Sequence, residues 1–172
     1  MTPTPQSRLG ATPSRTRLMG TPVATVMFGS LIGALLPIVA QSPTLPPFGL
    51  LFLLAWRLLH PTLWPLWIGV PLGAFDDLAT GAPLGSAVFL WTAVMIAIEM
   101  IDRRIFWRDY WNDWLIALVA VAFCLLGGAL FARIAGSHAP FWLLLPQILW
   151  SALAYPLMVR LTATVDRWRI MA

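Results

Sequence analysis

Two adjacent acids, Asp76 and Asp77, stand in an apolar stretch and are the first candidates for chemistry. Two carboxylates that face each other can share a proton and act as general acid and general base. Neighbouring residues of a helix point about 100° apart, however, so these two side chains cannot easily face each other. The next acid, Glu99, lies in the following apolar segment, roughly 15 residues or about 22 Å from its start. The acids therefore do not predict an aspartyl enzyme, and we expect a protein without catalytic residues.

The sulfur and imidazole side chains are too few for metal or redox chemistry. Cys124 is the single cysteine, which excludes an intrachain disulfide and a thiolate cluster. The two histidines, His60 and His138, are far apart in the chain and form no His-rich motif. We therefore expect neither a cofactor nor a metal ion.

Two further charged features have simple explanations. Glu99 and Arg103 have i,i+4 spacing with the acid first, an order that favours an ion pair at the surface of a helix. Arg57 is expected to extend along its helix and to place its guanidinium group at the membrane surface.

The overall composition predicts a membrane protein. Of the 172 residues, 59% are hydrophobic and only 10% are charged, against roughly 45–50% and about 25% in soluble domains. A spanning helix needs about 20 apolar residues, so six spans leave too few residues for a soluble catalytic domain. All basic residues are arginines scattered between apolar segments, a distribution that indicates membrane topology rather than a nucleic-acid surface.

Six apolar segments, bounded by Pro, Gly and charged residues, predict six transmembrane helices. Their expected ranges are residues 21–39, 46–59, 62–80, 84–101, 114–135 and 140–161. The expected domains are a disordered cytoplasmic tail (1–19), a six-helix transmembrane domain (20–162) and a short cytoplasmic tail (163–172). The second helix is short for a bilayer, so we expect it to tilt or to thin the membrane locally.

The positions of the arginines decide between six and five spans. With six helices and a cytoplasmic N-terminus, ten arginines face the cytoplasm and only Arg133 lies outside. With five helices, Arg57 would lie in the bilayer centre, at a cost of about 2.5 kcal/mol or more. The positive-inside rule thus favours six helices with both termini in the cytoplasm.

Asp77 shares one helix face with two glycines. Gly69, Gly73 and Asp77 are four residues apart, so this face should contact a neighbouring helix rather than lipid. A carboxylate near the outer end of the helix needs a partner. Arg133 ends the fifth helix at the same level, which predicts an Asp77–Arg133 ion pair. An alternative is that Asp77 caps the start of the fourth helix around residues 85–86, while Asp76 is solvated.

Glycine pairs four residues apart recur in three places. They are Gly29 with Gly33, Gly69 with Gly73, and Gly81 with Gly85. Small residues at this spacing let helices approach closely. The pairs predict internal packing, with docking of a partner helix as the alternative.

Residues 103–114 carry an unusual density of aromatic and charged side chains. On a helical wheel the aromatic residues, with Trp107 and Trp111 among them, fall on one side and most polar residues on the other. This pattern predicts an amphipathic helix on the inner leaflet and a platform for a cytoplasmic partner. The alternative is an ordinary aromatic belt in an irregular loop.

The stretch from residue 46 to residue 85 resembles the MreD family, the small membrane proteins of the bacterial rod-shape machinery. A proline opens the second helix, an aromatic residue lies late in it, and a proline follows. The core motif then comes as Gly, Asp, Gly and Leu-Gly, and an aromatic-Pro pair precedes the basic C-terminal end. The matching residues are Pro46, Trp56, Pro61, Gly73, Asp77, Gly81, Pro83, Leu84, Gly85, Tyr155 and Pro156.

The resemblance implies a non-enzymatic scaffold of the bacterial inner membrane that supports cell shape and lateral peptidoglycan synthesis. The implied partners are a bitopic MreC-like protein, MreB filaments, a RodA-type glycan polymerase and its transpeptidase, besides membrane lipid. The implied fold resembles the six-helix substrate-binding subunits of vitamin transporters. The alternative function is accordingly a solute-binding transporter subunit.

A solute site requires polar groups that converge inside the helix bundle. Deep polar residues are few, none is charged, and the main ones are Ser30, Thr92, Gln147 and Ser151. The sequence therefore favours the scaffold over the transporter subunit.

Overall fold

The computed structural model describes residues 15–35, 45–104, 109–136 and 141–171. These residues form six α-helices and two short 3-10 helices, which confirms the predicted all-α fold with six helices. In chain order they are α1 (Arg15–Leu35), α2 (Phe48–Leu59), η2 (Leu66–Ile68), α3 (Gly69–Thr80), α4 (Ser86–Asp102), α5 (Tyr110–Ile134), η3 (Phe141–Leu143) and α6 (Leu144–Met171).

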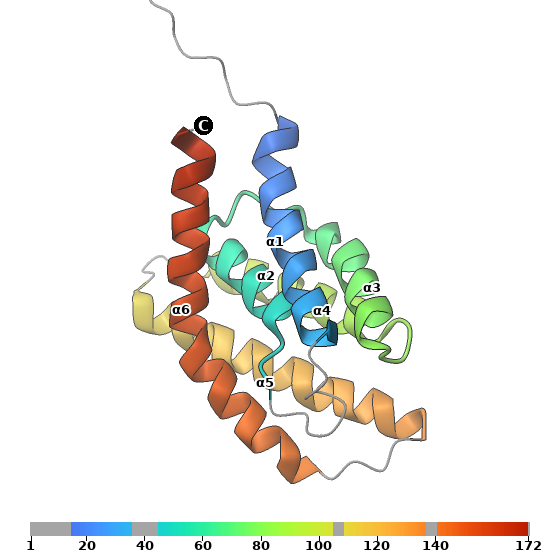
Figure 1. The fold of residues 1–172 in the computed structure, drawn as a ribbon. Helices are drawn as coiled ribbons and strands as arrows, with labels where there is room; N and C mark the ends of the chain where they lie inside the picture. The colour runs from blue at the N-terminus through green and yellow to red at the C-terminus, as the bar shows by residue number, and fades with distance from the viewer. Residues whose placement is uncertain (1–14, 36–44, 105–108, 137–140, 172) are drawn as a thin grey trace, which may run out of the picture.

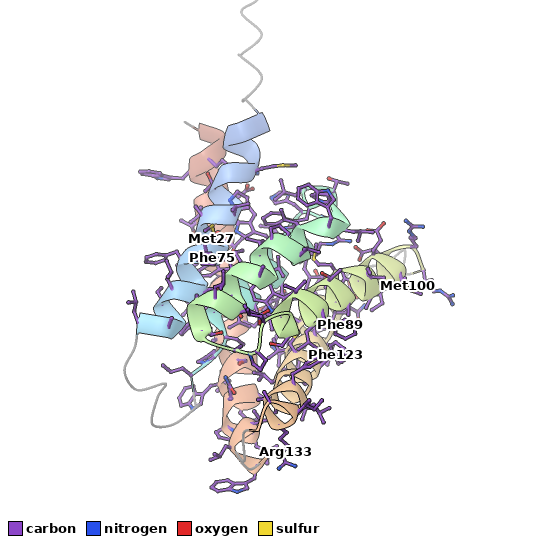
Figure 2. All side chains as sticks on the ribbon, turned by 90° about the vertical axis from the view of Figure 1, so that its right-hand side faces the viewer. Met27, Phe75, Phe89, Met100, Phe123 and Arg133 are labelled. Atoms are coloured by element: carbon purple, nitrogen blue, oxygen red, sulfur yellow. The ribbon has the colours of Figure 1, made fainter. Side chains whose placement is uncertain are left out.

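Five of the helices form a closed series of contacts, and α2 lies inside it (Figure 1). α1 packs against α3, α3 against α4, α4 against α5, and α5 against α6, which returns to α1. On the side of α1 and α3, Met27 and Phe75 mark this packing in Figure 2. α2 contacts α1, α5 and α6.

The enclosure of α2 is compatible with its sequence, which is apolar apart from Arg57. Helices of this kind are buried by protein or lipid on every side. Most of its side chains are buried here, namely Leu50, Leu51, Leu53, Leu54, Ala55, Trp56, Arg57 and Leu58. Because protein surrounds α2, its 12 residues do not have to match the bilayer by tilting or thinning.

The closed series of α1, α3, α4, α5 and α6 forms a ring of helices, and the outer surface of this helix ring is apolar. α5 and α6 are the two described helices that are long and apolar enough to cross a membrane alone. Many of their large apolar side chains are exposed, for example Leu115, Val119, Leu130, Leu149, Leu153 and Leu157. Soluble monomers rarely expose contiguous apolar surface of this extent, so the surface is suited to lipid.

The boundaries of three helices differ from the sequence prediction. α1 already begins at Arg15, inside the predicted N-terminal tail. α6 continues to Met171, so the predicted C-terminal tail is helical there; the reason is that Asp166 and Arg169 bind side chains of the α2 end. Residues 62–68 are turns and η2 rather than α-helix, because Pro65 is extended (ψ 149°) and has no N–H to donate.

α6 also contains a proline, Pro156, in its interior. Proline removes one backbone hydrogen bond and bends a helix. α6 changes direction in its middle part (Figure 1) and ends beside the start of α1, so the first and last described turns lie at the same end of the molecule.

The contact of α3 with α4 depends on two glycines. Gly69 and Gly73 are buried, and a Cβ atom at Gly69 would meet the backbone of Thr92 at 3.0 Å. At Gly73 the added Cβ would lie 2.7 Å from the backbone carbonyl of Ala87. α3 thus approaches α4 at backbone distance, as helices do at small residues.

We expect Gly73→Ala to lower the free energy of unfolding by about 1–3 kcal/mol, because the backbone of α4 cannot give way to the new methyl group. Gly33→Ala on α1 is the matched control, since no atom lies within 4 Å of its added Cβ. The control should be neutral or stabilising by about 0.5–1 kcal/mol. Thermal unfolding in detergent measures both, and equal effects would contradict close packing at Gly73.

Candidate functional site

The first candidate site is the carboxylate of Asp77, in the last turn of α3. Only 1% of Asp77 is exposed. Its Oδ2 accepts a hydrogen bond from the backbone N–H of Gly85 at 2.8 Å. Its Oδ1 accepts two, from the Ser86 hydroxyl and from the Ala87 N–H, both at 2.9 Å.

Asp77 therefore caps the N-terminus of α4. The first amides of a helix have no intrahelical acceptor, and the partial positive charge there favours a carboxylate. Asp77 supplies that carboxylate from the preceding helix and so fixes the α3–α4 hairpin. The structure therefore has the helix cap that the sequence offered as the alternative to an ion pair of Asp77.

The predicted ion pair of Asp77 with Arg133 is wrong. The hydrogen bonds of Asp77 go to the start of α4, while Arg133 is exposed in the last turn of α5 (Figure 2). Equal depth in the membrane was the basis for the pair, but depth does not determine which neighbour a side chain faces.

Two glycines shape the turn that the cap closes. Gly81 follows α3 with φ 70° and Gly85 precedes α4 with φ 95°, conformations that glycine adopts without strain. No atom lies within 4 Å of an added Cβ at either position. The predicted close helix contact at this pair is wrong, and the two residues serve the turn instead.

The neighbouring acid, Asp76, is half-buried rather than fully solvated. It lines a small cavity of about 120 Å³ together with Asp77, Cys124 and Gly128. The cavity lies between α3, α4 and α5, beside the start of α2.

The second candidate site is an ion cluster where the C-terminal ends of α2 and α4 meet. Arg57 is 1% exposed, and its Nη2 lies 2.7 Å from Glu99 Oε2 and 3.1 Å from Asp102 Oδ2. Its Nη1 donates to the carbonyl oxygen of Pro61 at 2.8 Å. The predicted extension of Arg57 toward the membrane surface is therefore wrong, because α2 is surrounded by protein and its arginine meets acids of a neighbouring helix.

The predicted pair of Glu99 with Arg103 is present and joins this cluster. Arg103 Nη2 lies 3.3 Å from Glu99 Oε1, and the Arg103 side chain is 74% exposed. Glu99 thus bridges a buried arginine and an exposed one.

A second polar group ties α6 to the same end of α2. His60 Nε2 lies 2.8 Å from Asp166 Oδ2, and Arg169 pairs with Asp166 Oδ1 at 2.6 Å. The Arg169 guanidinium also lies over the Trp56 ring, 5.3 Å from its centroid, and the Trp56 indole donates to Thr25 of α1 at 2.9 Å. The C-terminal ends of α2, α4 and α6 therefore lie together at one end of the bundle.

Residues 15–165 match the family model for the rod shape-determining protein MreD. The chain belongs to the MreD family. No curated protein and no solved structure matches it, so the expected likeness to vitamin-transporter subunits is not supported. Members of the MreD family are membrane proteins with a role in determining rod shape.

In this MreD-family chain the structure describes only the two ends of the predicted amphipathic helix over residues 103–114, because residues 105–108 lie outside the described residues. Arg103 is the C-cap of α4, and residues 110–114 form the start of α5. Trp111 is exposed there and makes an edge contact with Trp114, with ring centroids 6.1 Å apart. Trp107 lies outside the described residues. The amphipathic helix on the inner leaflet therefore stays a prediction.

The deep polar side chains of this MreD-family chain do not converge. Gln147 donates to the carbonyl oxygen of Leu45, and Ser151 donates to the carbonyl oxygen of Gln147 in its own helix. Thr92 lies against Gly69, and Ser30 lies against Gly49. Within the described residues, no group of three His, Cys, Asp or Glu side chains is placed to hold a metal ion.

The sequence did not identify the buried ion cluster as a site. A signal was present, because Arg57 follows an uninterrupted apolar run and Glu99 and Asp102 end another. Asp166 and Arg169 gave a weaker signal, since polar residues near a chain end are also typical of a solvated tail.

Proposed function

We propose that this MreD-family protein is a non-enzymatic membrane scaffold of the cell-elongation machinery. It supports lateral peptidoglycan synthesis by holding an MreC-like bitopic protein in a complex with a RodA-type glycan polymerase and its transpeptidase. The match of residues 15–165 to the MreD family carries this proposal.

The use of the polar residues supports a scaffold. The Asp77 cap joins α3 to α4, and the Arg57 and Asp166 groups join α2 to α4 and α6. These contacts connect helices of the chain to one another and leave the apolar outer surface for membrane neighbours. No observation favours the transporter subunit, because the deep polar groups do not converge.

Depletion of the protein in a rod-shaped bacterium tests the function. We expect rounding and swelling of the cells, rescue by the wild-type chain, and recovery of an MreC-like protein with the tagged chain. Normal rods after depletion would contradict the proposal. Rescue of growth and shape by a single added nutrient would instead indicate transport.

We also propose six membrane crossings with both termini in the cytoplasm of a bacterial inner-membrane protein. The arginine distribution supports this orientation, as does the common end of the first and last described turns (Figure 1). We expect alkaline-phosphatase fusions to Met1 and Ala172, which lie outside the described residues, to be inactive. An active fusion at Ala172 would contradict six crossings.

A further inference from the structure

An apolar groove of about 390 Å³ runs between α4 and α5 on the outside of the helix ring. Ala93, Ala97 and Ile101 line it from α4, and all of its lining residues are apolar. Leu115, Val119 and Phe123 line it from α5. The groove is open because Ala93 and Ala97 have small side chains. Phe123 lies on the same side of the molecule as Phe89 and Met100 of α4 (Figure 2).

The groove has the length of one membrane leaflet. On α4 the lining runs from Ala93 to Ile101, a rise of about 12 Å, and the lining of α5 is equally long. The hydrocarbon core is about 30 Å thick, so one leaflet contributes roughly 15 Å. Beyond the groove α4 and α5 pack directly against each other, because Phe89 and Phe131 meet edge to face with ring centroids 6.0 Å apart.

Two exposed arginines border the open end of the groove. Arg103 and Arg104 directly follow the end of α4, one turn beyond the last lining residue, and both are exposed. On α4 the nearby acids are Glu99, which pairs with Arg57 and Arg103, and Asp102, which pairs with Arg57. Asp109 and Asp113 lie at the same end, at the start of α5, so the complement to an anionic headgroup is the local pair of Arg103 and Arg104 and not a net charge.

We propose that the groove binds one acyl chain of an anionic phospholipid, with the lipid phosphate held by Arg103 and Arg104. The apolar lining fits the chain, its length fits one leaflet, and the arginines complement the headgroup. A transmembrane helix fits less well, because it is about 10–12 Å wide and would need a surface that continues through both leaflets. The site is independent of the proposed scaffold function, so either can fail alone.

The full-length protein is placed in phosphatidylcholine vesicles with a minor share of phosphatidylglycerol that carries a diazirine on its acyl chain. After illumination, mass spectrometry of peptides should find the label concentrated at groove residues such as Ala97 and Val119. Unlabelled phosphatidylglycerol should compete better than phosphatidylcholine. Arg103→Gln and Arg104→Gln should each reduce this preference about fivefold, whereas Arg160→Gln, at an exposed site on α6, should not.

Ala97→Leu fills the groove and should abolish its labelling, while Ala24→Leu at an exposed site on α1 should leave it unchanged. Even labelling of all exposed apolar faces would overturn the proposal, as would equal competition by phosphatidylcholine. The exposed arginine variants keep the test decisive if Ala97→Leu fails to fold. In cells, benzoylphenylalanine at position 119 should form a lipid adduct; a protein adduct would identify a helix as the occupant instead.

Discussion

Replacing Arg57 by alanine should destabilise the protein by about 3 kcal/mol, among the largest effects of any single substitution. Removing one partner of a buried ion pair leaves the other charge without compensation, which typically costs about 3–5 kcal/mol. The lower end applies because the Glu99 side chain is still 32% exposed. Denaturant unfolding in mixed micelles measures the loss, and we expect reduced accumulation in the membrane as well.

Arg103→Ala is the matched control, because Arg103 pairs with the same glutamate from an exposed position. Exposed pairs contribute about 0–1 kcal/mol, so this variant should unfold almost like the wild type. Adding Glu99→Ala and Asp102→Ala to Arg57→Ala should recover part of the stability, since an apolar cluster has no uncompensated charge. Equal losses for Arg57→Ala and Arg103→Ala would show that burial of Arg57 has no energetic role.

Replacing Asp77 by alanine should cost about 2–3 kcal/mol, because it removes a helix cap and leaves the donors of Gly85, Ser86 and Ala87 without an acceptor, the last two of them buried. Asp77→Asn should cost less, since one oxygen remains, but its amide N–H₂ would face a backbone donor. Thermal unfolding gives the stability, and hydrogen exchange should show faster opening in the first turn of α4.

Double-mutant cycles identify the partners of Asp77. Ser86→Ala alone should cost about 1 kcal/mol, and it should add little in the Asp77→Ala background because the same hydrogen bond is already lost. Arg133→Ala should have little effect, and its effect should be additive with that of Asp77→Ala. Coupling of Asp77 to Arg133 would restore the ion pair and contradict the cap.

The sequence was sufficient to predict the helices but not to predict which of them contact one another. Apolar runs between prolines, glycines and charges predicted six helices, and four-residue spacing placed Gly73 and Asp77 on one face. Hydropathy cannot show whether an apolar helix faces lipid or protein, because both surroundings are equally apolar. For that reason α2 was expected to meet lipid, and its arginine was expected at the membrane surface.

The sequence could not decide the partner of Asp77 for a related reason. Depth along a helix follows from the rise per residue, but the lateral neighbour depends on the packing of the whole bundle. The cap could be foreseen as an alternative because it is local in sequence, eight to ten residues away. The contacts of His60 with Asp166 span more than a hundred residues, and no spacing rule predicts such a pair.

The central place of α2 has a consequence for biogenesis. α2 is synthesised second, but its neighbours α5 and α6 leave the ribosome last. Until α4 and α6 arrive, Arg57 and His60 lack the acids that they bind in the finished protein, and a helix of 12 residues is too short to span a bilayer well on its own. We therefore expect the chain to mature in an all-or-none step late in synthesis, so that nascent chains ending before α6 are degraded by membrane quality control rather than accumulating as partial bundles.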